Sequence, residues 1–317
     1  MIDLAPFCEH GGRLAVARAR FGDGDWIDLS TGIAPWPYPA PASALDRLPE
    51  PGALAALEAA ARAAFGVPTA REVVAVPGTD MALRLLGMLL PARSPARLVP
   101  GYAGHRFAWP DAVAWTCGGE HDLLILANPN NPDGRCFDRG ELLDLASRMT
   151  LVVDEAYADI DPQRSVADVA LDQLVVLRSF GKFFGLPGLR LGFVIAAPRI
   201  AGHLRALLGD WPISAPALAT GRLAYADDAW GAAQRRRLAD MGEKLDSVMV
   251  AAAVAVVGST PFFRLIEVAD AHDLFRRLAS QRILARPFAE TPSRLRIGLP
   301  ADDAQLARLA DVMKDHP

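Results

Sequence analysis

The middle of the chain alternates between short apolar runs and longer segments with a helical pattern. The apolar runs indicate strands because they are roughly four to eight residues long and end in polar or glycine-containing turns. A helix is expected over Pro51–Phe65, which is rich in Ala and Leu and stops at Gly66. The expected strands are REVVAVPG, RLVP, VAWTC, DLLILANP, TLVVDEAY, LVVLRSFGK and RLGFVIAAP.

These strands are apolar along most of their length, which is typical of a parallel sheet buried on both faces. With the helices between them they predict an α/β fold, a mainly parallel central sheet with helices on both faces. After about residue 210 the pattern changes to a smaller α+β unit, with one long helix expected over 228–256. Residues 1–40 are rich in Gly and Pro and predict an extended arm. The expected domains are an arm (1–40) that joins the small domain, a large domain (41–210) and a small C-terminal domain (211–317).

Composition excludes several classes of protein. Of 317 residues, 51% are hydrophobic and 22% charged, which suffices for a packed core and excludes a disordered chain. The net charge of −4 and the lack of a basic run argue against a nucleic-acid partner. No apolar stretch approaches the ~20 residues of a membrane span, and no signal peptide is expected. Cys8, Cys117 and Cys136 lack metal or disulfide spacing, so we expect reduced thiols, no metal site and a cytoplasmic protein.

The strongest chemical signal is the segment SFGKFFGLPGLRLG, which follows an apolar strand. It places Lys182 beyond the end of that strand, where ligands bind in parallel sheets. A lysine there can bond to a carbonyl group if its surroundings lower its pKa. Arg190 offers a planar donor fork suited to phosphate. Three glycines after the lysine, Gly185, Gly188 and Gly192, would let the backbone approach closely.

This segment resembles the cofactor-lysine signature of the fold-type I pyridoxal 5′-phosphate (PLP) enzymes, the class I/II aminotransferase superfamily. Four other segments match that family in the right order. PGTD (77–80) resembles the phosphate loop, and PGY (100–102) resembles the segment whose aromatic ring stacks on the pyridine. NPNNPDG (128–134) closely resembles the NPNNPTG turn, and DEAY (154–157) matches a D-x-x-Y pattern.

The resemblance implies PLP as cofactor and a role for each matching residue. Asp154 would pair with the ring nitrogen, and Lys182 would hold the cofactor covalently and then transfer protons. Tyr157 and Asn131 would bind the phenolic oxygen. The implied catalytic residues are Lys182, Asp154 and Tyr157. The implied cofactor-binding residues are Gly78, Thr79, Asp80, Tyr102, Asn131, Asp154, Tyr157, Ser179, Lys182 and Arg190.

Two N-terminal segments point to one branch of this superfamily. EHGG (9–12) and DLSTGIAP (28–35) resemble the threonine-phosphate decarboxylases of cobalamin biosynthesis. Their kin, the histidinol-phosphate aminotransferases, lack the HGG start. That branch usually carries a tyrosine that reaches the PLP phosphate across the dimer, where this chain has Leu48. The decarboxylases often have Asn where this chain has Ala34.

Near the C-terminus, SRLRIGL (293–299) resembles the segment whose arginine binds the substrate α-carboxylate. The match falls on Arg296, with Arg294 as the second choice. The substrate-binding residues implied by the resemblance are His10, Gly32, Ile33, Arg296 and Arg294.

The leading interpretation is a PLP-dependent carboxy-lyase. It would decarboxylate L-threonine O-3-phosphate to (R)-1-amino-2-propanol O-2-phosphate in cobalamin biosynthesis, so its partner would be a small phosphorylated amino acid. The alternative is a histidinol-phosphate or related class I/II aminotransferase, which would use the same lysine and the same cofactor. A PLP-sensing transcription regulator would need a DNA-binding segment, for which this chain has no room. A homodimer is implied by the family.

Overall fold

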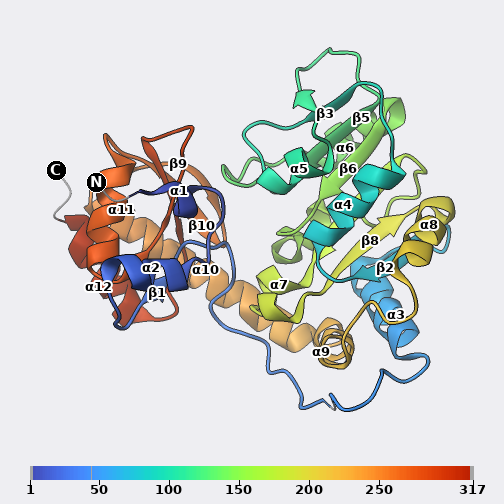
Figure 1. The fold of residues 1–317 in the computed structure, drawn as a ribbon, viewed down its shortest axis with the longest axis horizontal. Helices are drawn as coiled ribbons and strands as arrows, with labels where there is room; N and C mark the ends of the chain where they lie inside the picture. The colour runs from blue at the N-terminus through green and yellow to red at the C-terminus, as the bar shows by residue number, and fades with distance from the viewer. Residues whose placement is uncertain (1–2, 44, 315–317) are drawn as a thin grey trace. The chain divides into compact units, whose positions relative to one another are not determined.

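The computed structural model describes residues 3–43 and 45–314. They form two compact units, shown as a ribbon in Figure 1. The unit that we call the sheet unit comprises Pro37–Asn131 and Arg135–Ala232. The unit that we call the terminal unit comprises the N-terminal residues through Trp36, Pro132–Gly134, and the residues from Ala233 on.

A seven-stranded sheet forms the centre of the sheet unit, in the order β2–β8–β7–β6–β5–β3–β4. The strands from β7 to β4 are parallel to one another, and β8 is antiparallel to both β7 and β2. The predicted α/β fold with a mainly parallel sheet is therefore confirmed. The strands are β2 (Glu72–Val76), β3 (Pro95–Arg97), β4 (Val113–Ala114), β5 (Leu123–Ala127), β6 (Thr150–Asp154), β7 (Leu174–Ser179) and β8 (Gly192–Ala196).

Helices cover both faces of this sheet because successive strand residues point to opposite sides. Val152, Val175 and Leu177 belong to the core cluster that the buried leucines of α4 and α8 complete. On the other face Phe65 of α3 packs edge-on against Phe193, with ring centroids 5.7 Å apart. The helices are α3 (Ala53–Phe65), α4 (Thr79–Leu89), α5 (Ala103–Ala108), α6 (Arg139–Arg148), α7 (Phe180–Phe183), α8 (Pro198–Leu208) and α9 (Ala215–Tyr225). Short 3-10 turns are η1 (Ala158–Ile160), η2 (Pro162–Arg164) and η3 (Pro187–Leu189).

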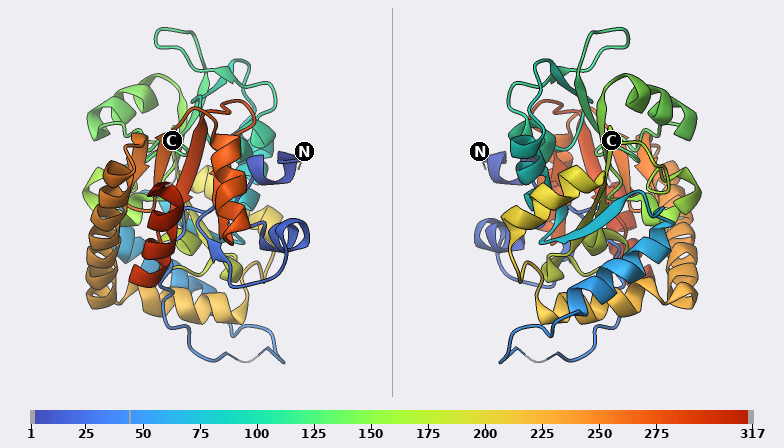
Figure 2. Two further views of the ribbon diagram at one scale, coloured as in Figure 1. Left: turned by 90° about the vertical axis from the view of Figure 1, so that its left-hand side faces the viewer. Right: turned by 90° about the vertical axis from the view of Figure 1, so that its right-hand side faces the viewer.

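The terminal unit is built on an antiparallel sheet in the order β12–β13–β10–β9 and a parallel pair, β1 with β11. Helix α11 packs against β12 and β13, with α12 beside it (Figure 2). The strands are β1 (Ile27–Asp28), β9 (Ala255–Thr260), β10 (Phe263–Glu267), β11 (Ile283–Leu284), β12 (Arg286–Pro287) and β13 (Arg294–Gly298). The helices are α1 (Ala5–Cys8), α2 (Leu14–Phe21), α10 (Asp228–Ala251), α11 (Ala271–Ser280) and α12 (Asp303–Lys314), of which α10 begins in the sheet unit.

Two expectations about local structure were wrong. The long helix expected over 228–256 ends at Ala251, because Ala253 takes a positive φ of 53° and the β-branched residues that follow form β9. The N-terminal arm is not extended throughout, since it folds into α1, α2 and β1. Strand β1 pairs with β11, which a reading of nearby residues could not foresee.

One fully buried arginine, Arg71, holds strands together at one end of the sheet. Asp154, the last residue of β6, lies at the opposite end of the sheet. Arg71, 1% exposed, donates through its guanidinium to the backbone oxygens of Val169, Leu171, Leu174 and Ile195. Burial lowers the pKa of Arg71 to about 10. The arginine stays charged at neutral pH and satisfies four carbonyl groups.

We predict that Arg71→Met lowers the free energy of unfolding by about 3 kcal/mol or more, because buried carbonyl groups lose their donors. At roughly 2–4 °C per kcal/mol, the thermal midpoint should fall by more than about 5 °C. Calorimetry checks this, with the exposed Arg47→Met as control. Equal midpoints for the two variants would contradict the prediction.

Candidate active site

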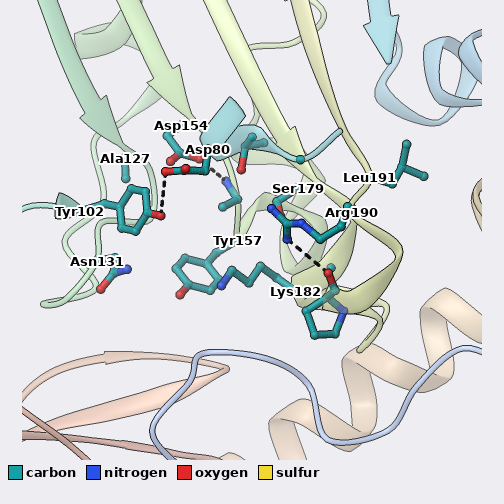
Figure 3. A pocket seen from close by; sticks show the side chains of 15 residues that line it. Asp80, Tyr102, Ala127, Asn131, Asp154, Tyr157, Ser179, Lys182, Arg190 and Leu191 are labelled. Atoms are coloured by element: carbon teal, nitrogen blue, oxygen red, sulfur yellow. Dashed lines mark hydrogen bonds between the residues drawn. The ribbon is translucent and has the colours of Figure 1, made fainter. Parts of the chain in front are cut away.

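Ten residues singled out from the sequence line one cavity of the sheet unit, which has a volume of about 130 Å³. Figure 3 shows Tyr102, Asn131, Tyr157 and Lys182 directed toward the same space. The cavity lies where β5, β6 and β7 end, as expected for a parallel sheet. The ten are Gly78, Thr79, Asp80, Tyr102, Asn131, Asp154, Tyr157, Ser179, Lys182 and Arg190.

Asp154 provides a buried carboxylate in this cavity. It is the last residue of β6 and shares a face with Val152, and only 5% of it is exposed. Its Oδ1 accepts a hydrogen bond from the backbone N–H of Ala156 (3.1 Å). Its Oδ2 lies 3.3 Å from Nε2 of His105, which is 1% exposed.

His105 is a site residue that the sequence interpretation missed. It follows Tyr102 by three residues, a spacing that places both side chains on one side of the short helix α5. The two rings meet edge to face, with centroids 5.6 Å apart. The three-residue spacing in GYAGH could have indicated His105 as a neighbour of Tyr102. It could not indicate the contact with Asp154, which lies 49 residues further along the chain.

A cradle for an anion lies at the start of α4. Gly78 precedes the helix with φ 89°, and a Cβ placed there would lie 2.6 Å from Nη2 of Arg190. Thr79 begins the helix, whose unpaired N–H groups and dipole favour a phosphate group. The hydroxyl group of Ser179 lines the same cavity. Backbone donors, a hydroxyl and a guanidinium therefore converge on one place.

The glycines after Lys182 differ in their importance. A Cβ on Gly192 would lie 3.0 Å from the backbone nitrogen of Thr79, so this glycine brings β8 against the cradle. Gly185 has φ 64°, a conformation that favours glycine. A Cβ on Gly188 would meet nothing within 4 Å. Close approach therefore does not explain Gly188.

The remaining polar groups on the Tyr102 side are mutually bonded. The hydroxyl of Tyr102 donates to Oδ1 of Asp80 (3.3 Å), and Arg84 lies 3.5 Å from the other carboxylate oxygen. Tyr157 is 2% exposed. The cavity is thus lined by two tyrosine rings, the carboxylate of Asp154 and the amino group of Lys182.

The predicted substrate-binding residues lie in the terminal unit, where the two N-terminal segments pack together. A Cβ on Gly11 would lie 2.2 Å from the carbonyl oxygen of Ser30, so only glycine fits this contact. The N–H of Gly12 donates to Oγ of Ser30 (2.8 Å). His10 therefore lies in a segment that packs against Ser30. Gly32 and Ile33 follow Ser30 by two and three residues.

Arg296 joins the same cluster. It is 2% exposed on β13, its Nη2 donates to the carbonyl oxygen of Ser30 (2.8 Å), and its guanidinium lies 4.9 Å from the ring centre of Phe263. Arg294, two residues earlier, is a third exposed and pairs with Glu267 at 3.3 Å. The buried Arg296 is thus the stronger candidate of the two.

A second buried arginine, Arg286, was missed from the sequence. It is 9% exposed on β12 and pairs directly across from Arg296 in the antiparallel ladder. Its Nη2 donates to the carbonyl oxygen of Glu9, next to His10 (2.8 Å). No local sequence pattern indicated Arg286, because strand pairing brings it opposite Arg296, ten positions further along the chain. Two arginines at facing positions of one strand pair suit an anion.

Comparison with solved structures defines the class of fold. The histidinol-phosphate aminotransferase of Sinorhizobium meliloti, solved in complex with pyridoxal 5′-phosphate, superposes with a TM-score of 0.80. The match covers 99% of this chain and 96% of that one at 19% identity. The chain thus has the fold of the PLP-dependent aminotransferases.

Sequence comparison then defines the family. The model of aminotransferase class I and II matches residues 109–313. A threonine-phosphate decarboxylase of Sinorhizobium is 38% identical over 96% of this chain and 97% of its own length. The threonine-phosphate decarboxylase of Pseudomonas aeruginosa is 39% identical over 95% of this chain and 96% of its own. The chain belongs to the class I and II aminotransferase family.

Among residues 3–43 and 45–314, no group of three or more His, Cys, Asp or Glu side chains is arranged to hold a metal ion. No helix in that part of the chain is long and apolar enough to cross a bilayer.

We predict that His105→Ala lowers turnover about tenfold or more, because a hydrogen bond to a charged group contributes roughly 1.5–3 kcal/mol. Asp154 would lose the partner that fixes its Oδ2. The matched control is His203→Ala, an exposed histidine of α8 in the same unit. Steady-state rates that are equal in both variants would refute this role for His105.

Proposed function

We propose that this protein is a PLP-dependent decarboxylase of L-threonine O-3-phosphate that releases CO2 and (R)-1-amino-2-propanol O-2-phosphate, a step of cobalamin biosynthesis. The observation that carries the proposal is the near full-length similarity, at 38% and 39% identity, to two threonine-phosphate decarboxylases. The cavity adds support, because a lysine, an acid and an anion cradle line one space.

The residues of the cavity fit a phosphorylated pyridine aldehyde. The start of α4, Ser179 and Arg190 would bind the phosphate group. Gly78 leaves room for the guanidinium of Arg190, which a Cβ at this position would displace. Tyr102 would lie against the ring, and Tyr157 and Asn131 would bind its phenolic oxygen. Lys182 would hold the aldehyde carbon covalently.

When bound, PLP supplies a ring that takes up the electron pair left on the substrate's Cα as CO2 departs. Asp154 would keep a proton on the ring nitrogen, and His105 would keep the carboxylate of Asp154 in place. Lys182 would also move a proton at Cα. In this proposal residues 41–210 bind the cofactor.

Arg296 and Arg286 bind the carboxylate in this proposal, and His10 contributes to holding the phosphate group. Directly paired positive side chains repel each other, and an anion bound to both reduces the repulsion. The net charge of −4 supplies no general attraction for an anionic substrate, so local cations must hold it. Gly32 and Ile33 would line the same place.

We also propose a homodimer. The sheet unit exposes large apolar side chains, including Leu48 at 62% and Trp211 at 59%, which line one groove. Exposed apolar patches of this kind often mark interfaces between chains. Light scattering of the purified protein tests the oligomeric state.

The decisive experiment incubates the purified protein and PLP with threonine phosphate and measures CO2 and keto acid separately. We expect CO2 and the amino alcohol phosphate, without keto acid. Borohydride should trap the cofactor on Lys182, so Lys182→Ala should be inactive and untrapped. Asp154→Asn should retain PLP but lose at least about a hundredfold in turnover, because a developing charge loses its fixed electrostatic partner.

The controls separate the rival activities. Keto acid and pyridoxamine phosphate formed from histidinol phosphate, with no CO2 from threonine phosphate, would replace the decarboxylase by an aminotransferase. Full turnover of Asp154→Asn would remove its role at the ring nitrogen.

We predict that Arg296→Met, Arg286→Met and His10→Ala each raise the KM for threonine phosphate about tenfold or more, because each loses a charge-assisted contact. Cofactor binding should not change. Arg18→Met, on α2 and half exposed, is the control in the same unit. Threonine without its phosphate group should be a poor substrate of the wild type and should show no further loss in His10→Ala. A further loss there would place His10 elsewhere than at the phosphate.

A further inference from the structure

A buried ionic cluster lies on the sheet face opposite to Asp154. Arg178 on β7 has its side chain only 3% exposed, and its Nη1 lies 3.1 Å from Oε2 of Glu155, which is fully buried. Its Nη2 bonds to Oδ1 of Asp159 at the start of the turn that follows β6. The guanidinium also lies 4.4 Å from the ring centre of Phe65. We call Glu155, Asp159 and Arg178 the buried triad.

Two residues of the buried triad are chain neighbours of residues that line the cavity. Glu155 directly follows Asp154, and Arg178 directly precedes Ser179. Because side chains alternate along a strand, Asp154 and Ser179 point to the cavity while Glu155 and Arg178 point away from it. The ion pair therefore joins the ends of two adjacent strands directly behind the cavity.

Each carboxylate oxygen of Glu155 is occupied. Oε1 accepts the N–H of Val166 (2.7 Å), and Oε2 accepts the hydroxyl of Ser165 (2.5 Å) as well as Arg178. Burial raises the pKa of Glu155, against the opposing influence of Arg178 and these donors. Burial alone would lower the pKa of Arg178, but Asp159 and Glu155 outweigh it and raise that pKa.

Stability alone does not account for such a cluster. Taking charges out of water is so costly that apolar residues of similar volume usually serve a core equally well or better. The backbone ladder already joins β6 to β7, from Leu151 with Leu174 to Asp154 with Leu177. What the buried triad adds is directional bonding at the last residues of both strands, where a small shift would move the cavity's acid and hydroxyl.

We infer that Glu155 and Arg178 are positioning residues, which hold Asp154 and Ser179 at a fixed separation so that one bound cofactor can be gripped at both its ring nitrogen and its phosphate group. This inference rests on the proposed function, because it assigns those two contacts to PLP. A chain of aromatic contacts also links Arg178 to the helix that carries Lys182. Tyr225 lies edge-on to Phe65 at 5.0 Å and to Phe180, at the start of the helix that carries Lys182, at 5.7 Å.

Two conservative variants test the inference. Glu155→Gln keeps the volume, but either orientation of its amide sets an NH2 group against a donor. Arg178→Lys keeps the charge, but one ammonium group cannot bond to Glu155 and Asp159 as the two ends of the guanidinium group do. The control is Arg71→Met, which removes an equally buried arginine bonded at the opposite end of β7, at Leu174.

The measurements are the thermal midpoint, the dissociation constant of PLP from the apo protein, and the pH titration of the absorbance of bound PLP. For both variants of the buried triad we expect PLP binding to weaken roughly tenfold or more, since small displacements of positioned groups have large effects. We also expect the titration midpoint to shift by about half a pH unit or more. Arg71→Met should lower the thermal midpoint and leave both cofactor readouts unchanged at temperatures where it is folded.

The inference is overturned if the variants of the buried triad lose only thermal stability, or if Arg71→Met alters the cofactor readouts as much as they do. Should Arg178→Lys not fold, Glu155→Gln decides alone by the same criteria. A wild type that binds no PLP contradicts the proposed function itself, and that titration is done first.

Discussion

The alternation of side chains at the ends of β6 and β7 is the constraint on which the rest of the site depends. Because these parallel strands are paired in register, with Asp154 opposite Leu177, their last residues end at one edge of the sheet. One residue of each then faces the cavity, Asp154 and Ser179, while their chain neighbours face the opposite helical layer. A register slip of one residue would turn Glu155 and Arg178 toward the cavity and bury the acid and the hydroxyl behind it.

The two units use arginine for opposite purposes. In the sheet unit Arg71 and Arg178 are bonded to carbonyl groups and carboxylates, which gives each guanidinium a fixed place inside the core. In the terminal unit Arg286 and Arg296 face each other across a strand pair and bond to the carbonyl oxygens of Glu9 and Ser30. Arg71 and Arg178 thus hold strands of the central sheet in fixed places, whereas Arg286 and Arg296 occupy facing positions of one strand pair.

Much of this could be predicted from sequence because the signals are local. The helix over 53–65 has a glycine stop in the αL conformation, and the strands of the central sheet are short apolar runs. The ten residues of the cavity were found through motifs that follow those strands. His105 and Arg286 escaped because their partners come from distant parts of the chain, Asp154 by side-chain contact and Arg296 by strand pairing. The end of α10 was misplaced because alanines favour a helix up to Ala253, where the backbone takes a positive φ and ends the pattern.

The residues that bind the cofactor cannot by themselves decide between decarboxylation and transamination, since the lysine, the acid and the ring contacts serve both. What differs between the reactions is which bond of Cα is aligned with the ring, and that depends on where the carboxylate is held. Selectivity must therefore lie with the groups that bind the substrate's anionic ends. Under the proposed assignment these groups are His10 and Arg296, and both belong to segments that pack against Ser30. Gly11 fits against Ser30 only because it lacks a Cβ, and Arg296 bonds to the same carbonyl group. The glycines of EHGG thus allow the segment of His10 to pack against Ser30, the same residue whose carbonyl oxygen accepts a hydrogen bond from Arg296.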